Sequence, residues 1–443
     1  MASRRTILRA GALLPLAAAC TPFGAGESAD AVKIAVPWGG AELQAFEAIL
    51  TNLRKSGQFS HRTVVTTLGD DVGTVFAAGR FAPDIVVVPQ IGQIPRLAAD
   101  NRLHALDEKL WSDDAKKPRY ADGWWPLVHV EAKGNRLYGL PFKATCKSLI
   151  WYDRTRFTRL NLAPPDRWPP WLWPALMTRL ARSGVHPLAL GGADGWMLTD
   201  FFANVLLAES RDTYESVANP NDWRPDQRRA ELTRALRTLA SIWGFDGAFP
   251  GNIGRALTQQ FPDAVRAVFG TGSAAMVVAP DFAEPIVRGC FGGDDVRMAE
   301  TVGVSLFPSN LPPFGKGPMI GGGDVLVATR SASAKALELI GLLSGPELLT
   351  DWISAGGFIA PDLRVQPGYS PLLDTTLNLS GPRIRAWSEF DLADRIGSRG
   401  GDNPLWRVIT AFLTDLDDPA KRESVAVAHA VDAIYELEHG RRG

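Results

Sequence analysis

The chain has 443 residues, 46% of them hydrophobic and 21% charged, which is enough for two domains that each bury a core. Its 47 lysines and arginines nearly balance its 48 aspartates and glutamates, so the formal net charge is −1. Because no basic excess is available to neutralise a phosphate backbone, this composition argues against a nucleic-acid partner.

The N-terminal residues have the composition of an export signal. A basic start that contains Arg4, Arg5 and Arg9 is followed by an apolar run over 10–16. The stretch SRRTIL resembles a twin-arginine signal in which Ile7 stands in place of the usual Phe. The apolar run is too short to span a bilayer, since a span needs about 20 residues. The resemblance to a twin-arginine signal implies that the chain is exported after it has folded.

The sequence LAAAC resembles the processing site of a lipoprotein, although it carries Ala17 where most such sites carry Leu. The resemblance implies that residues 1–19 are a signal peptide and that Cys20 becomes the diacylated first residue of the mature chain. Residues 20–30 would then form a tether to the extracytoplasmic face of the cell membrane. Loss of the three signal arginines would change the formal charge from −1 to −4.

Strands and helices alternate after the tether. Hydrophobic patterns predict a strand over 31–38, an amphipathic helix over 41–57, a strand over 62–68, a short helix over 71–80 and a buried strand over 83–89. Strands that alternate with helices form parallel sheets with right-handed crossovers, so this order predicts a doubly wound α/β layout.

The rest of the chain is richer in helices. Helical patterns dominate 165–290. A strand that begins within 319–328 is followed by helical segments at 332–343, 346–357 and 417–440.

The stretch MIGGGDVLVA places three glycines and Asp324 directly before the apolar part of that strand. Phosphate- and dinucleotide-binding loops carry their glycines between a strand and a helix, so neither motif fits. Two alternatives remain. The glycines let the backbone approach another surface closely, with Asp324 pointing into the space in front, or the stretch is a turn in which Asp324 bonds local amides.

Motifs for catalysis and for metal binding are missing from the sequence. The six histidines show no metal-ligand spacing, and no nucleophile elbow is present. We therefore expect a protein that is not an enzyme and that holds neither a cofactor nor a metal. Two alternatives stay open: an exported carbohydrate-active hydrolase with paired carboxylates, and a lipoprotein receptor without a transport role.

Two cysteines remain if Cys20 is lipidated. An extracytoplasmic location permits a disulfide between Cys146 and Cys290, but nothing in the sequence places them close together. Two buried free thiols are the favoured alternative.

Several motifs together resemble the family 1 extracellular solute-binding proteins. GLPFKATCKSLIWYDRTRF (139–157) looks like the segment in which those chains cross to the second lobe. ALGGADGWMLTDFFANVLL (189–207) resembles their Gly-Trp-x-x-Thr-Asp helix start. MIGGGDVLVA, WISAGGFIAP and SEFDLAD resemble, in order and spacing, the C-terminal third of the α-glucoside-binding branch.

This resemblance implies a two-lobed periplasmic-binding-protein fold of type II, of α/β class, with a ligand cleft between lobes joined by a hinge. Lobe 1 would comprise 31–143 plus 313–365, and lobe 2 would comprise 148–312 plus 366–443. Such proteins capture a small carbohydrate, here an α-glucoside or another oligosaccharide, and deliver it to the permease subunits of an ABC importer. We expect a monomer.

The resemblance also implies that five side chains bind the ligand. Trp196 is the first candidate for an aromatic plate against the apolar face of a sugar, and Trp151 is the second. Asp324 would accept hydrogens from sugar hydroxyls, and Lys143 would donate to them. Trp38 would face the cleft from the end of the first strand. For each of the five, the alternative is core packing or a surface ion pair.

Overall fold

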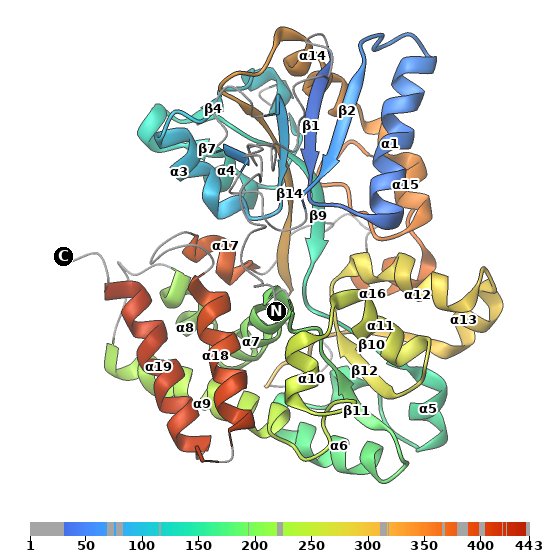
Figure 1. Ribbon diagram of the computed structural model, residues 1–443, viewed down its shortest axis with the longest axis vertical. Coiled ribbons are helices and arrows are strands. Elements are labelled where there is room, and N and C mark those ends of the chain that lie inside the picture. The colour runs from blue at the N-terminus through green and yellow to red at the C-terminus, as the bar shows by residue number, and fades with distance from the viewer. Residues whose placement is uncertain are drawn as a thin grey trace, which may run out of the picture.

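Two sheets, each covered by helices, form the centres of two lobes in the computed structural model (Figure 1). The expected signal peptide, the tether and Cys20 lie outside the described residues, as do most of the short helix expected over 71–80 and most of residues 311–318 around the expected lobe boundary at 312/313. The structure describes residues 31–68, 75–76, 83–114, 117–193, 195–218, 225–310, 317, 319–365, 368–378, 389–397, 404–418, 420–421 and 423–439.

The upper lobe begins with the predicted alternation. β1 (Val32–Val36) pairs in parallel with both β2 (Thr63–Thr67) and β3 (Ile85–Val88). α1 (Gly40–Lys55) connects the first two strands, and its apolar side is buried. The parallel pairing expected of a doubly wound layout is confirmed for β1, β2 and β3, while most of the second expected crossover helix lies outside the described residues.

The sheet is completed by strands from distant parts of the sequence. β14 (Ile320–Thr329) lies antiparallel to β3 and to β9 (Leu140–Cys146). Two short strands, β4 (Leu103–His104) and β15 (Glu389–Phe390), also pair with β14. Within the described residues the sheet has seven strands, with the path β15-β14-β3-β1-β2. Long-range pairing of this kind leaves no signal in local periodicity.

The glycines of MIGGGDVLVA lie inside β14 rather than before it. At Gly323, where φ is +154°, an added Cβ atom would lie 2.0 Å from the carbonyl oxygen of Lys143 on β9. At Gly322 an added Cβ would lie 2.9 Å from Cε of Lys147. The glycines therefore allow β14 to approach β9 closely and leave room for the Lys147 side chain. Of the two alternatives drawn from the sequence, close approach is confirmed and the turn is wrong.

The lower lobe contains a sheet that has, within the described residues, four strands in the order β11-β12-β10-β13. β10 (Leu149–Asp153) is antiparallel to β12 (Ala274–Val278) and to β13 (Val302–Leu306), whereas β11 (His186–Ala189) is parallel to β12. The chain thus leaves the upper sheet at the end of β9 and enters the lower sheet after two intervening residues.

Helices supply most of the lower lobe, as the helical patterns over 165–290 predict (Figure 1). Its helices include α5 (Arg154–Arg159), α6 (Trp173–Ala181), α7 (Trp196–Glu209), α8 (Arg211–Ala218), α9 (Pro225–Trp243), α10 (Ile253–Thr258), α11 (Phe261–Phe269), α12 (Glu284–Phe291) and α13 (Asp295–Thr301).

The C-terminal third returns first to the upper lobe and then to the lower one. α14 (Ala334–Leu343) and α15 (Thr350–Ala355) pack on the upper lobe, and α16 (Pro371–Leu377) packs beside β13. α18 (Pro404–Asp417) and α19 (Glu423–His439) pack on α9 in the lower lobe. The expected helices at 332–343 and 417–440 are confirmed, the latter over the part that the structure describes.

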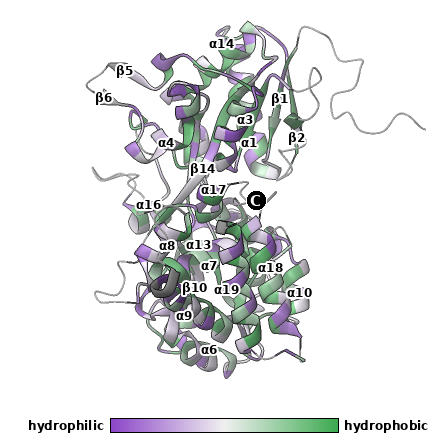
Figure 2. Cartoon of the chain, turned by 90° about the vertical axis from the view of Figure 1, so that its left-hand side faces the viewer, coloured by the Kyte–Doolittle hydropathy of each residue, from purple (hydrophilic) through white to green (hydrophobic). Residues whose placement is uncertain are grey.

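The lobes meet around α17 (Leu392–Ile396) and β14, as the side view shows (Figure 2). The two-lobed α/β architecture is therefore as expected, while the residue-level boundaries of the lobes stay a prediction. Among the described residues, none of the helices has the length and apolarity that a bilayer crossing requires. Cys146 is buried and Cys290 is half-buried, and both are free thiols, so the disulfide alternative is not realised.

Candidate functional site

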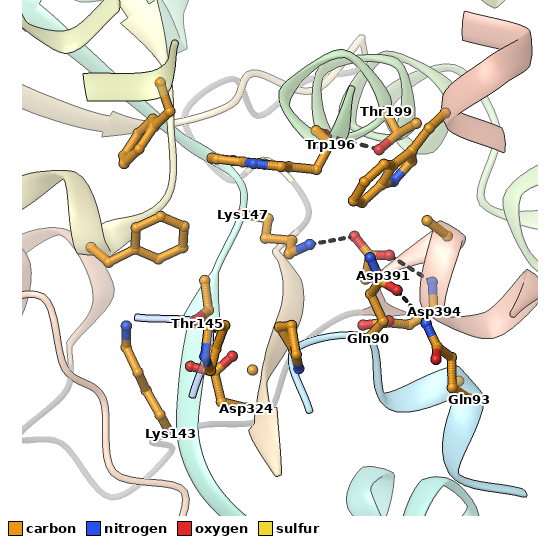
Figure 3. Close-up of a pocket in the computed structure, with 18 of the residues that line it drawn as sticks. Gln90, Gln93, Lys143, Thr145, Lys147, Trp196, Thr199, Asp324, Asp391 and Asp394 are labelled. Carbon is orange, nitrogen blue, oxygen red and sulfur yellow. Dashed lines mark hydrogen bonds and ion pairs between the residues drawn. The ribbon is translucent and has the colours of Figure 1, made fainter. Parts of the chain in front are cut away.

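A cavity of about 270 Å³ lies between the lobes and is lined by side chains from both. The lining includes four of the five side chains expected from the sequence, namely Trp38, Lys143, Trp196 and Asp324. Figure 3 shows Asp324 and Lys143 on one side of this cleft, Asp391 and Asp394 on the other, and Trp196 above the space between them.

Asp324 is held in place by Trp38, another of the expected site residues. The Nε1–H group of Trp38, two residues beyond the end of β1, donates a 2.7 Å hydrogen bond to Oδ2 of Asp324. The Asp324 side chain is nearly enclosed, with 9% of the residue exposed. Burial raises the pKa of Asp324 to about 6, even though the nearby charge of Lys143 and the Trp38 hydrogen bond both lower it. The carboxylate is therefore oriented by Trp38 and short of compensating charge.

Lys143 lies beside Asp324 on β9 and forms an ion pair with Glu42 of α1. Its ammonium also lies 4.8 Å from the centre of the Phe282 ring, within the range of a cation–π contact. Burial lowers the pKa of Lys143, but the charges of Glu42, Asp324 and Asp281 outweigh burial and the net shift is upward. Lys143 thus stays charged, with part of its hydrogen-bonding capacity already used by Glu42.

Trp196 begins α7 and forms one wall of the cleft. The preceding residue, Gly195, has φ of +77°, a left-handed conformation that glycine adopts without strain and that turns the chain into the helix. The Trp196 ring is partly exposed and lies 5.1 Å from the ring of Phe261 and 5.8 Å from the ring of Phe282. An apolar aromatic surface therefore faces the polar side chains of β9 and β14.

Trp151 is the one expected site residue that the structure places elsewhere. Its side chain is 0% exposed in the middle of β10, and its Nε1–H group donates to the carbonyl oxygens of Ala279 and Pro280 at 3.1 and 3.2 Å. The assignment of Trp151 as a ligand-binding residue is wrong. Strand alternation could not distinguish the two faces of β10, because both faces are covered in this sheet.

A second charged group, of which Lys147, Asp391 and Asp394 line the cleft, was missed in the sequence. Nζ of Lys147 lies 2.8 Å from Oδ2 of Asp391 and 3.2 Å from Oδ1 of Asp200. Burial raises the pKa of Asp200 to about 8, although Lys147 lowers it, and burial together with the charge of Asp391 raises the pKa of Asp394 well above its ordinary value. These residues lie in the motifs KSLIWY, GWMLTD and SEFDLAD, which marked the family resemblance without indicating a role.

Trp406, on α18, is a further aromatic residue of the cleft wall that the sequence did not single out. It packs against Gly195, where an added Cβ atom would lie 3.2 Å from Cβ of Trp406. Since it lies 210 residues beyond Trp196, only the folded chain places both rings at one cleft.

The lining of the cleft is complementary to a polar ligand that carries several hydroxyl groups and has apolar faces. Aromatic rings can cover C–H faces, while carboxylates, amides and hydroxyls can bond a rim of hydroxyl groups. The lining offers Gln90, Gln93, Thr145 and Thr199 beside the charged residues. Among the described residues, histidines, cysteines and acids form no group suited to a metal ion.

Comparison with known proteins gives homologues of one kind, the solute-binding proteins of ABC transporters. The chain is 24% identical over 349 residues to the osmoprotective compounds-binding protein GgtB of Synechocystis sp., with 76% of this chain and 77% of GgtB covered. It is 25% identical over 358 residues to the alpha-glucosides-binding periplasmic protein AglE of Rhizobium meliloti, with 75% and 72% covered. No protein-family model matches the chain.

Solved structures agree with this result at the level of the fold. The ligand-free form of RafE from Streptococcus pneumoniae superposes with a TM-score of 0.65 at 14% identity, covering 93% of this chain and 99% of RafE. A protein from a study of xylan utilization by Caldanaerobius polysaccharolyticus superposes with a TM-score of 0.72 at 16% identity, covering 93% and 100%. The chain therefore shares the fold of these structures over 93% of its length.

Proposed function

We propose that the protein is an extracytoplasmic substrate-binding lipoprotein, which captures an α-glucoside or another oligosaccharide in the interlobe cleft and delivers it to the permease of an ABC importer. The observation that carries the proposal is the cleft itself, in which the partly exposed Trp196 ring lies opposite the buried Asp324 carboxylate. The relatives GgtB and AglE, both binding proteins, support the same class of function.

Each cleft residue has a distinct role in this proposal. Trp196 stacks on the apolar face of a sugar ring, and Asp324 accepts a hydrogen bond from a hydroxyl of that ring. Trp38 acts as a positioning residue, since its Nε1–H is already bonded to Asp324 and only 4% of the residue is exposed. The positive charge of Lys143 favours the ionised form of Asp324, and its ammonium donates a hydrogen bond to a neighbouring hydroxyl of the sugar.

Anchoring and transport complete the proposal. Diacylated Cys20 would hold the protein at the extracytoplasmic face of the membrane after twin-arginine export, and residues 20–30 would let the lobes reach the permease. The protein would act as a monomer and would perform no catalysis. Its relatives are binding components of transporters rather than enzymes, which is consistent with this role.

A thermal-shift screen tests the proposal. The mature protein is melted with trehalose, maltose, sucrose, raffinose, glucosylglycerol and xylobiose, each at 10 mM, and hits are titrated by calorimetry. A sugar at 100 times its dissociation constant adds about 2.7 kcal/mol to the free energy of unfolding, which is a measurable shift. Binding of at least one of these sugars supports the proposal. Absence of any shift, with an amino-acid and a peptide panel giving one instead, would overturn it.

A further inference from the structure

The cleft has an excess of carboxylates over cations. Among the described residues that line the cleft, the cations Lys143 and Lys147 lie with four acidic side chains, Glu42, Asp324, Asp391 and Asp394. The lining thus has two ammonium groups and four carboxyl groups. Buried charges are stable only when paired, so such a site gains from a positive charge that the chain does not provide.

Asp394 shows this deficit most directly. The residue lines the cleft and is 5% exposed, and its Oδ2 atom has no hydrogen-bond partner among the described residues. By contrast, both oxygens of its neighbour Asp391 are engaged, one by Nζ of Lys147 at 2.8 Å and the other by the Asp394 amide at 2.8 Å. Nζ of Lys147 pairs with Asp391 and Asp200, and the charge of Lys147 lowers the pKa of Asp394 without offsetting its burial. A buried carboxylate oxygen at the cleft wall therefore lacks a donor.

A metal ion is not a suitable source of the positive charge that the carboxyl groups of the cleft lack. The described residues place no set of three or more acids, histidines or cysteines around a common point where an ion could bind. The carboxylates instead face a space bounded by aromatic rings, among them Trp196 and Trp406. Aromatic faces attract organic cations and also cover C–H groups, so the surroundings fit a carbon-bound ammonium better than a bare ion.

We propose that the ligand is a glycoside that carries a basic nitrogen, an amino sugar or imino sugar, whose ammonium group binds to Asp394 beside Asp391. This inference rests on the proposed function, because it names the class of sugar for the same cleft. The sugar ring lies between Trp196 and Asp324, and the ammonium-bearing part extends toward α17, on the side of the cleft where Figure 3 shows Asp391 and Asp394.

The raised pKa values of Asp200, Asp324 and Asp394 agree with this picture. Burial is the largest cause at each site, because removal from water disfavours the ionised carboxylate, and the charges of Lys143 and Lys147 do not offset it. An ammonium in the cleft would favour the ionised carboxylates, whereas a neutral sugar would leave them as they are.

A matched set of ligands tests the inference by calorimetry at pH 7.0. Trehalose is compared with its 2-amino, 4-amino and 6-amino deoxy derivatives and with the N-acetyl form of each. At least one amino derivative should bind at least tenfold more tightly than trehalose, and N-acetylation should remove that gain because it removes the charge. The inference is overturned if no amino derivative binds more tightly than trehalose, or if the N-acetyl form retains the gain.

Two variants locate the ammonium site. Asp394→Asn should reduce the ratio of the two affinities, amino derivative over trehalose, by at least tenfold. Asp351→Asn, a matched change at an exposed carboxylate on α15, should leave the ratio unchanged. An unchanged ratio in Asp394→Asn would overturn the assignment of the site. If trehalose or another neutral sugar binds while every amino derivative fails, the inference falls and the proposed function stands; if all sugars fail, both fall.

Discussion

Replacing Asp324 with asparagine should stabilise the unliganded protein at neutral pH and weaken its binding of sugar. The raised pKa of about 6 means that the folded protein holds this proton more tightly than the unfolded chain, whose Asp pKa is about 3.9. The free energy of unfolding therefore falls as the pH rises from about 4 through 6, because the buried side chain becomes ionised over this range. A difference of about two pKa units corresponds to roughly 3 kcal/mol above pH 6. Asparagine avoids this cost and can still accept the hydrogen bond from Trp38.

Thermal melts at pH 4.5 and pH 7.5 measure the effect, with Asp351→Asn as the control for loss of a surface charge. The Asp324→Asn variant should melt several degrees above the wild type at pH 7.5, and this advantage should shrink markedly at pH 4.5. Its sugar affinity should fall about 10- to 150-fold, since a charged hydrogen bond contributes about 1.5–3 kcal/mol. A variant that melts below the wild type at pH 7.5 and binds sugar normally would refute the reasoning, because Asp324 would then be a structural anchor.

Four further predictions follow from the placement of single residues and of the lobes. Trp196→Ala should weaken sugar binding at least tenfold in calorimetry with little change in the unliganded melt, whereas Trp151→Ala should lower the free energy of unfolding by about 3–5 kcal/mol; equal effects on affinity would contradict the two placements. Gly323→Ala should destabilise the fold by at least about 2 kcal/mol in urea titration, because its Cβ would clash with the carbonyl of Lys143. Cys20→Ser should move the protein from the membrane fraction to the soluble fraction, and retention on the membrane after a high-salt wash would contradict lipid anchoring. Sugar binding should reduce the radius of gyration in small-angle scattering, and an unchanged radius at saturation would count against closure of the cleft.

Local sequence patterns predicted the helices and strands of this fold better than they predicted which strands pair with one another. The alternation over 31–89 led to β1, α1, β2 and β3 because each element there buries one periodic face. The pairing of β14 with β3, β9 and β15 joins segments more than 60 residues apart, so no local pattern contains it. The family resemblance supplied what periodicity lacked, namely the crossing to a second lobe after β9.

The candidate site was only partly predictable for the same reason. Asp324 could be singled out because three consecutive glycines precede it directly before an apolar run, and Trp196 because it follows a Gly-rich stretch at the start of a helical pattern. The sequence around Trp151 does not distinguish a cleft residue from a core residue. In the structure, burial on both faces of β10 places Trp151 in the core. Lys147, Asp391 and Asp394 are ordinary charged residues in the sequence. Their placement as a group depends on the close approach of the end of β9 and the starts of α7 and α17, which exists only in the folded chain.

This approach also links the ligand site to the contact between the lobes. Lys147 directly follows β9, where the chain leaves the upper sheet, and its ammonium binds Asp391 at the start of α17. α17 in turn contacts the short helix η2 (Ile91–Gln93) of the upper lobe, where an added Cβ at Gly92 would lie 1.7 Å from the carbonyl oxygen of Asp394. A ligand that bonds to Asp391 and Asp394 therefore contacts the same element that joins the lobes. It shifts the lobes toward this arrangement by the difference in its affinity for the joined and separated forms, so capture of the ligand and closure of the cleft become one equilibrium.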